Sequence, residues 1–204
     1  MSGDRESSYW NDAYRSTPPW DIGRPQPVFV ELAKKGELVL GSVLDIGCGT
    51  GENAILLAES GYTVTGVDAA PIAIDKAKAK AKARNVNVEF RIRNALNLNL
   101  GQSRFDNAID SGLFHTFHDN ERPAYAKQVA KSLREGGKYF MGCFSENEPT
   151  DWGGPRRISK AEIQDTFSLL FQINYIHDAL FATRIHDNGG KAYLTSATKV
   201  ASKG

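Results

Sequence analysis

Cysteine, net charge and long apolar runs are scarce in this sequence, and each scarcity excludes a class of protein. Of 204 residues only Cys48 and Cys143 are cysteines, which fits neither a disulfide framework nor a metal cluster and favours a reducing compartment. The 25 basic side chains nearly cancel the 24 acidic ones, so no net field draws the protein to nucleic acid or to an anionic membrane. The polar, acidic N-terminus is unlike a signal peptide, and no stretch approaches the roughly 18 apolar residues of a membrane span. We therefore expect a cytoplasmic protein whose partners include neither nucleic acid nor a membrane.

The order of the apolar segments predicts an α/β fold. With 41% hydrophobic and 24% charged residues, the chain is long enough to bury the core of one domain over residues 1–204. Short runs rich in β-branched and aromatic residues, typical of strands, occur at 42–47, 62–68, 86–92, 105–112 and 138–144. Helical stretches lie between them at 51–60, 71–84 and 119–134, and the glycines of REGGK end the last one. This alternation predicts a Rossmann-like, doubly wound parallel sheet with helices on both faces.

The two ends of the chain depart from that alternation. After a short helix within ISKAEIQDTF, the segments 171–184 and 191–201 flank IHDNGG, whose Asn and Gly residues suit a hairpin turn. This antiparallel pair is expected to complete a seven-stranded, mostly parallel sheet at its C-terminal edge. Residues 1–37 are predicted to form helical pieces interrupted by the proline-rich STPPWDIGRPQP. We expect them to cover a core made of residues 38–204.

A basic run, KAKAKAKAR at 76–84, invites comparison with nucleic-acid-binding segments. Lysine at every second position spreads around a helix instead of making one stripe, and alanine is the best helix former. The run therefore predicts a solvated surface helix.

The segment LDIGCGTGENA at 44–54 follows the first strand, where an open parallel sheet binds ligands if the strand order reverses there. Gly47, Gly49 and Gly51 allow tight turns and close ligand approach. A P-loop would need a lysine after Gly51, where Glu52 stands instead. The dinucleotide fingerprint needs its third glycine at that same position, and the Glu52 carboxylate would repel a pyrophosphate. An oxidoreductase that uses NAD on a similar sheet is therefore the alternative rather than the first hypothesis.

A ligand with an adenosine, no phosphate and a positive charge suits this loop better. S-adenosylmethionine has a sulfonium and an ammonium group, and its carboxylate can use the N-terminus of the helix that follows. The second strand ends at Asp68, where a carboxylate can accept hydrogen bonds from both ribose hydroxyls. Capping of the helix that begins near Pro71 is the other role open to Asp68.

Together these motifs strongly resemble the class I S-adenosylmethionine-dependent methyltransferases. The resemblance covers about residues 40–200 and rests on VLDIGCGTG, VTGVD, RNALNL, FDNAIDSGLFH and LREGGKYFMGCFS. The segments PPWDIGRPQP, SGLFHTF and GPRRIS resemble a small-molecule branch that includes thiopurine, thiol and quinolone methyltransferases. This resemblance implies methyl transfer from S-adenosylmethionine, with S-adenosylhomocysteine as product, to an O, S or N atom of a small aromatic or heterocyclic acceptor.

The same resemblance implies a set of cofactor contacts at the carboxyl ends of the strands and in the cover: Asp45, Ile46, Gly47, Cys48, Gly49, Gly51, Asp68, Ala69, Asn94, Ala95, Asp110 and Trp20. One position departs from the family pattern, because Asn94 stands where an aspartate usually meets the adenine amino group. Its amide oxygen can still accept that hydrogen bond. The backbone N–H of Ala95 is expected beside it.

Methyl transfer from a sulfonium expels a neutral thioether, so alignment and exclusion of water do most of the work. A base is needed only for an acceptor that arrives protonated. His115, just beyond the fourth strand, is the candidate catalytic residue, as a base or as an orienting group, and a structural contact with the backbone is its alternative role. Phe114 beside it is a predicted substrate contact. We expect no metal site, since Asp110, Asp119 and Glu121 match no definite cage.

Aromatic residues in the cover are expected to close over the cofactor and to stack on a flat acceptor. Trp10 and Tyr14 are the predicted substrate contacts there, while Phe29 is expected to pack in the core. Arg156, after the fifth strand, is predicted to meet an anionic group of the substrate, and an ordinary surface role is its alternative. Cys143 is expected to be a buried small hydrophobe.

Other function classes remain open at this stage. A protein or nucleic-acid methyltransferase is disfavoured by the neutral charge and by the lack of an NPPY-like tetrapeptide. A module that holds the cofactor without turnover is the remaining alternative. The sequence leaves open whether the protein is a monomer or a homodimer.

Overall fold

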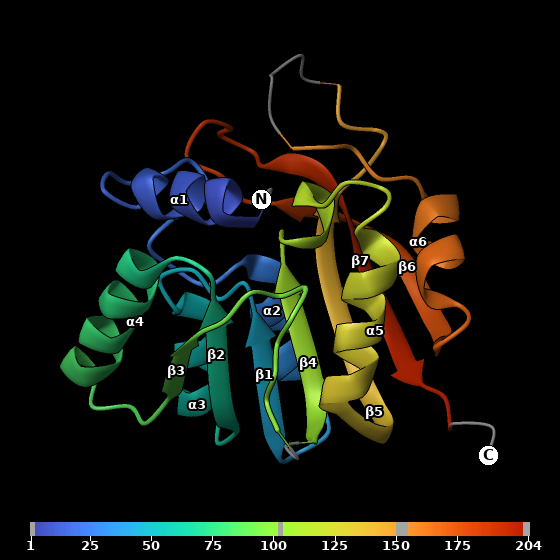
Figure 1. Ribbon diagram of the computed structural model, residues 1–204, viewed down its shortest axis with the longest axis horizontal. Helices are drawn as coiled ribbons and strands as arrows, with labels where there is room; N and C mark the ends of the chain where they lie inside the picture. The colour runs from blue at the N-terminus through green and yellow to red at the C-terminus, as the bar shows by residue number, and fades with distance from the viewer. Residues whose placement is uncertain (1–2, 102–103, 150–154, 202–204) are drawn as a thin grey trace.

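The computed structural model describes residues 3–101, 104–149 and 155–201, and its centre is a seven-stranded sheet (Figure 1). The strand order is β3-β2-β1-β4-β5-β7-β6. The strands are β1 (Ser42–Ile46), β2 (Thr63–Asp68), β3 (Glu89–Ile92), β4 (Phe105–Ser111), β5 (Leu133–Phe144), β6 (Phe171–Phe181) and β7 (Gly190–Lys199). The first five pair in parallel, and β7 runs antiparallel to both β5 and β6. The predicted Rossmann-like sheet with an antiparallel C-terminal hairpin is confirmed.

Helices cover both faces of the sheet, because alternate side chains of each central strand point to opposite sides. The helices are α1 (Gly3–Ala13), α2 (Pro27–Lys35), α3 (Glu52–Glu59), α4 (Pro71–Ala83), α5 (Arg122–Ser132) and α6 (Lys160–Phe167), with a 3-10 turn η1 (Phe114–Thr116). On β1, Val43 packs with residues of α2, α3 and α4. Its neighbour Leu44 packs on the other face with residues of α5 and α6. The result is a three-layer α/β sandwich.

The N-terminal segment divides into two parts with different roles. Helix α1 lies across the upper end of the sheet in Figure 1, above α4 and β2. Helix α2 instead packs into the core, where Phe29 and Leu32 are buried beside Ile109 and Phe140 of the central strands. Phe29 is thus a core residue, as expected. The prediction that all of residues 1–37 form a cover must be corrected, because the apolar face of α2 packs against the sheet as part of the core.

The helix predicted over 119–134 is shorter than expected at both ends. It begins at Arg122 and ends at Ser132, and Leu133 is already extended with φ −90° and ψ 147°. The glycines of REGGK therefore do not cap the helix. Gly136, with φ 70°, lies inside β5, where the pairing with β4 shifts from Phe105–Leu133 to Asn107–Lys138. The glycine serves a strand irregularity rather than a helix end.

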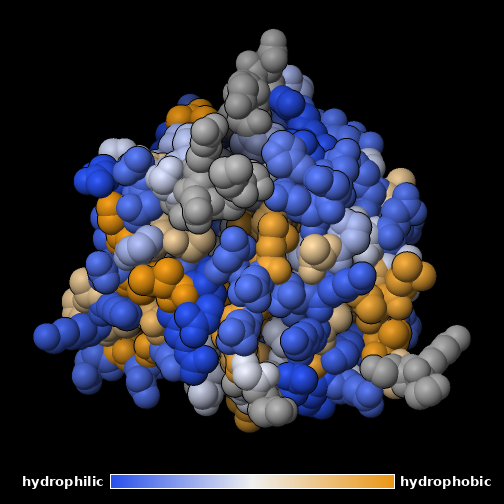
Figure 2. All heavy atoms as spheres, in the orientation of Figure 1, coloured by the Kyte–Doolittle hydropathy of each residue, from blue (hydrophilic) through white to orange (hydrophobic). Residues whose placement is uncertain are grey.

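The exposed surface shows no broad apolar face in the view of Figure 2, where apolar side chains are scattered among hydrophilic ones. Within the described ranges, none of the helices combines the length and hydrophobicity that a bilayer span requires.

Candidate cofactor and active site

The glycine loop leaves β1 at the point where the strand order reverses between β1 and β4. Gly47, Gly49 and Gly51 all have positive φ, at 72°, 52° and 84°, a conformation that costs glycine little. The backbone N–H groups of Gly47 and Cys48 donate to the carbonyl of Val67 on β2, at 2.8 and 3.0 Å. The loop is thereby held at the carboxyl edge of the sheet, where an α/β fold binds its ligand.

Asp45, next to the carboxyl end of β1, has a buried carboxyl group without a partner among the described residues. Its side chain is fully buried, and neither oxygen has a hydrogen-bond partner among the described residues. Burial raises the pKa of Asp45 to about 8, with further contributions from the charges of Asp110 and Asp68. The nearby N–H of Ala54, in the first turn of α3, lowers that pKa somewhat without reaching hydrogen-bond geometry. An unpaired buried carboxylate is costly to folding, which indicates that a cation belongs beside it.

Asp68, at the end of β2, supports the loop with both of its oxygens. Oδ1 accepts from the N–H of Ala70 at 2.8 Å, and Oδ2 accepts from the N–H of Gly49 at 2.9 Å. These contacts close the turn before α4 but do not cap that helix, which has no side-chain cap, so the capping role left open for Asp68 is not the one observed. Each oxygen keeps a lone pair for a ribose hydroxyl. Ala69, the next residue, is half-buried.

Asp110, at the end of β4, is surrounded by donors. Tyr125 donates to Oδ2 at 2.6 Å, Leu113 N–H donates to Oδ1 at 2.7 Å and Phe114 N–H donates to Oδ2 at 3.1 Å. The Tyr139 hydroxyl lies 3.3 Å from Oδ2. Burial raises the pKa of Asp110 to about 6 despite these donors. The carboxylate shapes the turn after β4 and adds negative charge near the glycine loop.

Asn94 lies in an exposed turn after β3, and its side chain already serves that turn. Its Oδ1 accepts from the N–H of Leu96 at 2.8 Å, an Asx-type contact. Ala95 is half-buried beside it. The amide oxygen keeps one lone pair for an adenine amino group, so the predicted role of Asn94 stays a prediction.

Glu52 does not act as the sequence suggested. Its carboxylate is buried and points to α4, where it forms ion pairs of 2.8 Å with Lys80 and with Arg84. The charge is therefore neutralised, and the argument that Glu52 repels a pyrophosphate is wrong. Of the two acids that flank the glycine loop, only Asp45 has a carboxyl group without a partner among the described residues.

His115 is held as a neutral ring. Its Nδ1 accepts the backbone N–H of Phe144 at 3.1 Å, and the ring stacks on Phe144 with centroids 5.0 Å apart. Phe181 meets the ring edge-on at 6.1 Å. Burial lowers the pKa of His115 to about 3. Since Nδ1 is an acceptor, the neutral tautomer has its hydrogen on Nε2, and the backbone contact left open by sequence reasoning is present.

Phe114 and Arg156, two of the predicted substrate contacts, are engaged by other parts of the protein. Phe114 is fully buried in the core between Tyr125 and Phe167, so an acceptor cannot reach it without repacking. Arg156 donates to Asp119 at 2.8 Å and contacts His118 at 2.7 Å. Its guanidinium is thus occupied by the loop before α5, which matches the ordinary surface role. Cys143 is fully buried, as expected.

The aromatic residues of the cover gather over the start of α4, and one of them contacts the glycine loop. Trp20 meets Trp10 edge-on with centroids 5.5 Å apart, and its Nε1 donates to the Tyr14 hydroxyl at 3.1 Å. A Cβ on Gly49 would lie 2.7 Å from that hydroxyl, so the phenol rests on the loop. Tyr14 is buried, and the two tryptophans are half-buried. The structure brings together the three cover residues that were predicted to contact ligands.

Comparison with known proteins adds independent support. A family model described as a methyltransferase domain matches residues 43–137. A 2-heptyl-1-hydroxyquinolin-4(1H)-one methyltransferase from Mycobacteroides abscessus is 36% identical over 189 residues, which cover 90% of this chain and 81% of that protein. The chain belongs to the class I S-adenosylmethionine-dependent methyltransferases. Its cofactor is S-adenosylmethionine.

Two further relatives of this methyltransferase are informative. A probable thiol methyltransferase from Arabidopsis thaliana is 26% identical over 166 residues, covering 80% of this chain and 73% of that protein. A solved structure from work on the conversion of a disulfide bond into a thioacetal group during echinomycin biosynthesis is 33% identical, with a TM-score of 0.87. The matched region covers 96% of this chain and 92% of the chain in that structure. The likeness extends over the N-terminal cover as well as the sheet.

The residues of the methyltransferase fit its cofactor. Asp45 offers an orphaned carboxylate to a cation, and Asp68 retains lone pairs for a ribose. The N-terminus of α3 follows Gly51 and offers backbone N–H groups to a carboxylate. Ile46 is buried in the core beneath the loop and Cys48 is half-buried within it, so their predicted contacts would come through the backbone.

Several residues that hold this site together escaped the sequence argument. Thr50 donates to Asp21 of the cover at 2.9 Å and receives a hydrogen bond from Lys80 at 2.7 Å. Lys76 and Asn11 tie α4 to α1. One signal was available in the sequence: Ala70 is a poor N-cap for the helix that begins at Pro71, which indicates a cap from another element.

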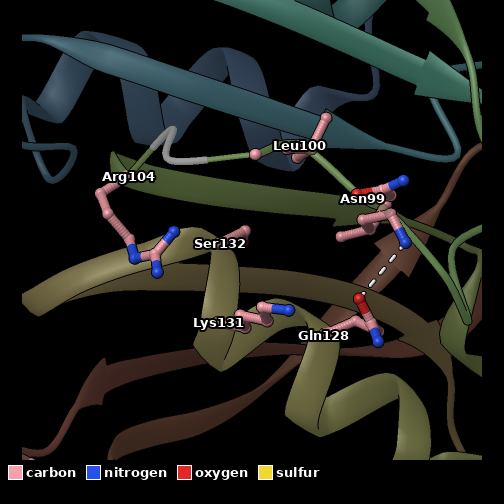
Figure 3. A pocket seen from close by; sticks show the side chains of 8 residues that line it. Asn99, Leu100, Arg104, Gln128, Lys131 and Ser132 are labelled. Carbon is pink, nitrogen blue, oxygen red and sulfur yellow. Dashed lines mark hydrogen bonds between the residues drawn. The ribbon is translucent and has the colours of Figure 1, made fainter.

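A small hollow lies at the opposite, amino-terminal end of the sheet (Figure 3), with a volume of about 40 Å³. It lies between the loop after β3 and α5, where Gln128 accepts the backbone N–H of Leu98 at 3.2 Å. It is far too small for a nucleoside. Among the described residues no group of three His, Cys, Asp or Glu side chains could hold a metal ion.

Proposed function

We propose that this methyltransferase transfers the methyl group of S-adenosylmethionine to an oxygen, sulfur or nitrogen atom of a small aromatic or heterocyclic acceptor. The observation that carries the proposal is the unpaired Asp45 carboxylate beside a glycine loop that aromatic side chains cover. The names of the quinolone and thiol methyltransferases among its relatives support a small acceptor.

The chain supplies the environment for a cationic donor. The bound cofactor supplies an electrophilic methyl group on a sulfonium, whose departure as a neutral thioether needs no acid. Asp45, with the charges of Asp68 and Asp110 nearby, stabilises the positive charge of the bound donor in a site of low dielectric constant. Trp10, Tyr14 and Trp20 exclude water and offer ring faces to a flat acceptor.

His115 is assigned an orienting role in this proposal. Its Nδ1 is occupied by the Phe144 N–H, and only an Nε2–H donor remains for an acceptor. A donor can fix the position of an acceptor atom but cannot remove its proton. We therefore expect acceptors that ionise readily in water, or that bring a free lone pair, to react best.

The test is transfer of a radiolabelled methyl group to a panel of thiols, phenols, hydroxyquinolones and purines. We expect label in at least one small aromatic acceptor, with more in those of low pKa. Label found only on protein or RNA would overturn the proposal. Calorimetry with S-adenosylhomocysteine, and with NADH as the control dinucleotide, shows whether the site itself binds as expected.

A further inference from the structure

Lys76 of α4 makes hydrogen bonds to the backbone of the cover just after helix α1. Its Nζ donates to the backbone carbonyl of Tyr14 at 2.6 Å and to that of Ser16 at 3.2 Å. Helix α1 ends at Ala13, so both carbonyls lie just beyond its C-terminus, where a cation interacts favourably with the helix dipole. Lys76 therefore fixes the backbone at Tyr14, the residue that rests on the glycine loop.

Asn11 makes a second connection between the same two helices. Its Oδ1 accepts the N–H of Ile72 at 3.0 Å, one of the free N–H groups in the first turn of α4. Helix α4 has no side-chain cap of its own. The cover thus supplies the cap that α4 lacks, while α4 supplies the cation that α1 lacks.

Tyr14 is the buried residue of the cover that contacts the glycine loop. Its hydroxyl contacts Gly49, whose N–H donates to Asp68. Burial and the charge of Asp68 raise the pKa of Tyr14, so the hydroxyl is neutral. A ligand that reaches Gly49 must displace or pass this side chain, and the hydrogen bond from Lys76 to the Tyr14 carbonyl restrains the backbone that carries it.

We propose that Lys76 is a positioning residue that latches the cover through Tyr14 and thereby sets the rate at which S-adenosylmethionine and S-adenosylhomocysteine exchange. The latch acts on the backbone of the cover and touches neither ligand. The proposal rests on the cofactor of the family and is independent of which acceptor the enzyme methylates.

The test measures binding and release of S-adenosylhomocysteine by stopped-flow tryptophan fluorescence. The sequence has three tryptophans, and a Trp152→Phe background leaves Trp10 and Trp20 of the cover as the reporters. Lys76→Met removes both hydrogen bonds, and we expect association and dissociation to become roughly tenfold faster. Lys78→Met, an exposed lysine on the same helix, is the matched control and should leave both rates unchanged.

Lys76→Arg distinguishes a latch from general destabilisation, because a guanidinium can donate to two carbonyls and should restore slow exchange. Asn11→Ala loosens the cover from its other connection and serves if Lys76→Met does not fold; we expect faster exchange in it as well. Exchange rates that stay at the wild-type values in folded Lys76→Met, or in Asn11→Ala, would overturn the proposal.

Discussion

Two buried aspartates on neighbouring strands, Asp45 of β1 and Asp110 of β4, illustrate two uses of the same side chain. Both are fully buried and both have raised pKa values, about 8 and about 6. Asp110 accepts hydrogen bonds from two tyrosines and two backbone N–H groups. Asp45 accepts none from the residues that the structure describes.

The difference separates a structural acid from a binding acid. Donors from the protein itself satisfy Asp110, so replacing this residue should lower the free energy of unfolding. The partner of Asp45 must come from outside the chain. Replacing Asp45 should therefore lower the affinity for the ligand while raising the free energy of unfolding. The following predictions test this contrast, from the largest expected effect to the smallest.

The largest effect is expected for Asp45→Asn on cofactor binding. Removing one member of a buried charge pair costs about 3–5 kcal/mol, which corresponds to an affinity for S-adenosylmethionine that is roughly a thousandfold lower. Isothermal titration calorimetry measures it directly. Near wild-type affinity in a folded Asp45→Asn protein would show that the carboxylate does not face the cation.

Asp110→Asn should act on stability instead. The amide places an NH₂ group among donors that need an acceptor, and we expect a loss of about 3 kcal/mol in the free energy of unfolding. Urea denaturation followed by circular dichroism provides the measurement. Tyr125→Phe, which deletes only the shortest of the hydrogen bonds to Asp110, is the milder control and should cost less.

The pH dependence of stability should reveal Asp45 as well. Its pKa in the folded protein, about 8, lies above the unfolded value of 3.8, so the unfolded chain releases this proton first as pH rises. Stability is therefore lost between pH 4 and pH 8, by about 4 kcal/mol for this group. Asp45→Asn should lack that loss in urea titrations at pH 5 and pH 8, and an identical pH profile for both proteins would contradict the assignment.

His115→Gln should have the smallest effect. Glutamine can accept from the Phe144 N–H and still donate, so turnover should fall by less than about tenfold.

Burial lowers the pKa of His115 from 6.5 to about 3, so the wild type loses stability as pH falls below 6.5, by about 1 kcal/mol at pH 5.5. The variant should lack this acid-side loss, and any inflection in the wild-type profile of turnover against pH should persist in it, because the neutral ring of His115 is not the base. An inflection that disappears in His115→Gln would restore His115 as the base.

Local patterns were sufficient for much of the fold. Alternating strands and helices predicted the parallel sheet, and the Asn-Gly turn before β7 predicted the hairpin, because both signals depend on residues close in the sequence. The end of α5 was misassigned, since the glycines of REGGK are compatible with a helix cap and with a strand irregularity alike. Only the pairing of β5 with β4 distinguishes the two.

For the site, the glycine loop and Asp68 could be predicted because they belong to one strand–helix–strand unit, with α3 alone between β1 and β2. The direction of Glu52, by contrast, depends on Lys80 and Arg84, which lie 28 and 32 residues further along the chain. The role of Lys76 was hidden for the same reason: in KAKAKAKAR an alanine follows every lysine, and it is the position of α1 that gives Lys76 a contact with the cover.

By itself the sequence determined the order of the elements, the glycine turns with their positive φ, and the family to which the chain belongs, since these depend on backbone preferences and short spacings. Tertiary structure alone decided which of the buried acids is left without a partner, which tautomer His115 adopts and which lysine holds the cover. Those outcomes depend on donors and charges that reach each group from distant segments, and the energy of a buried polar group is set by whatever folding places beside it.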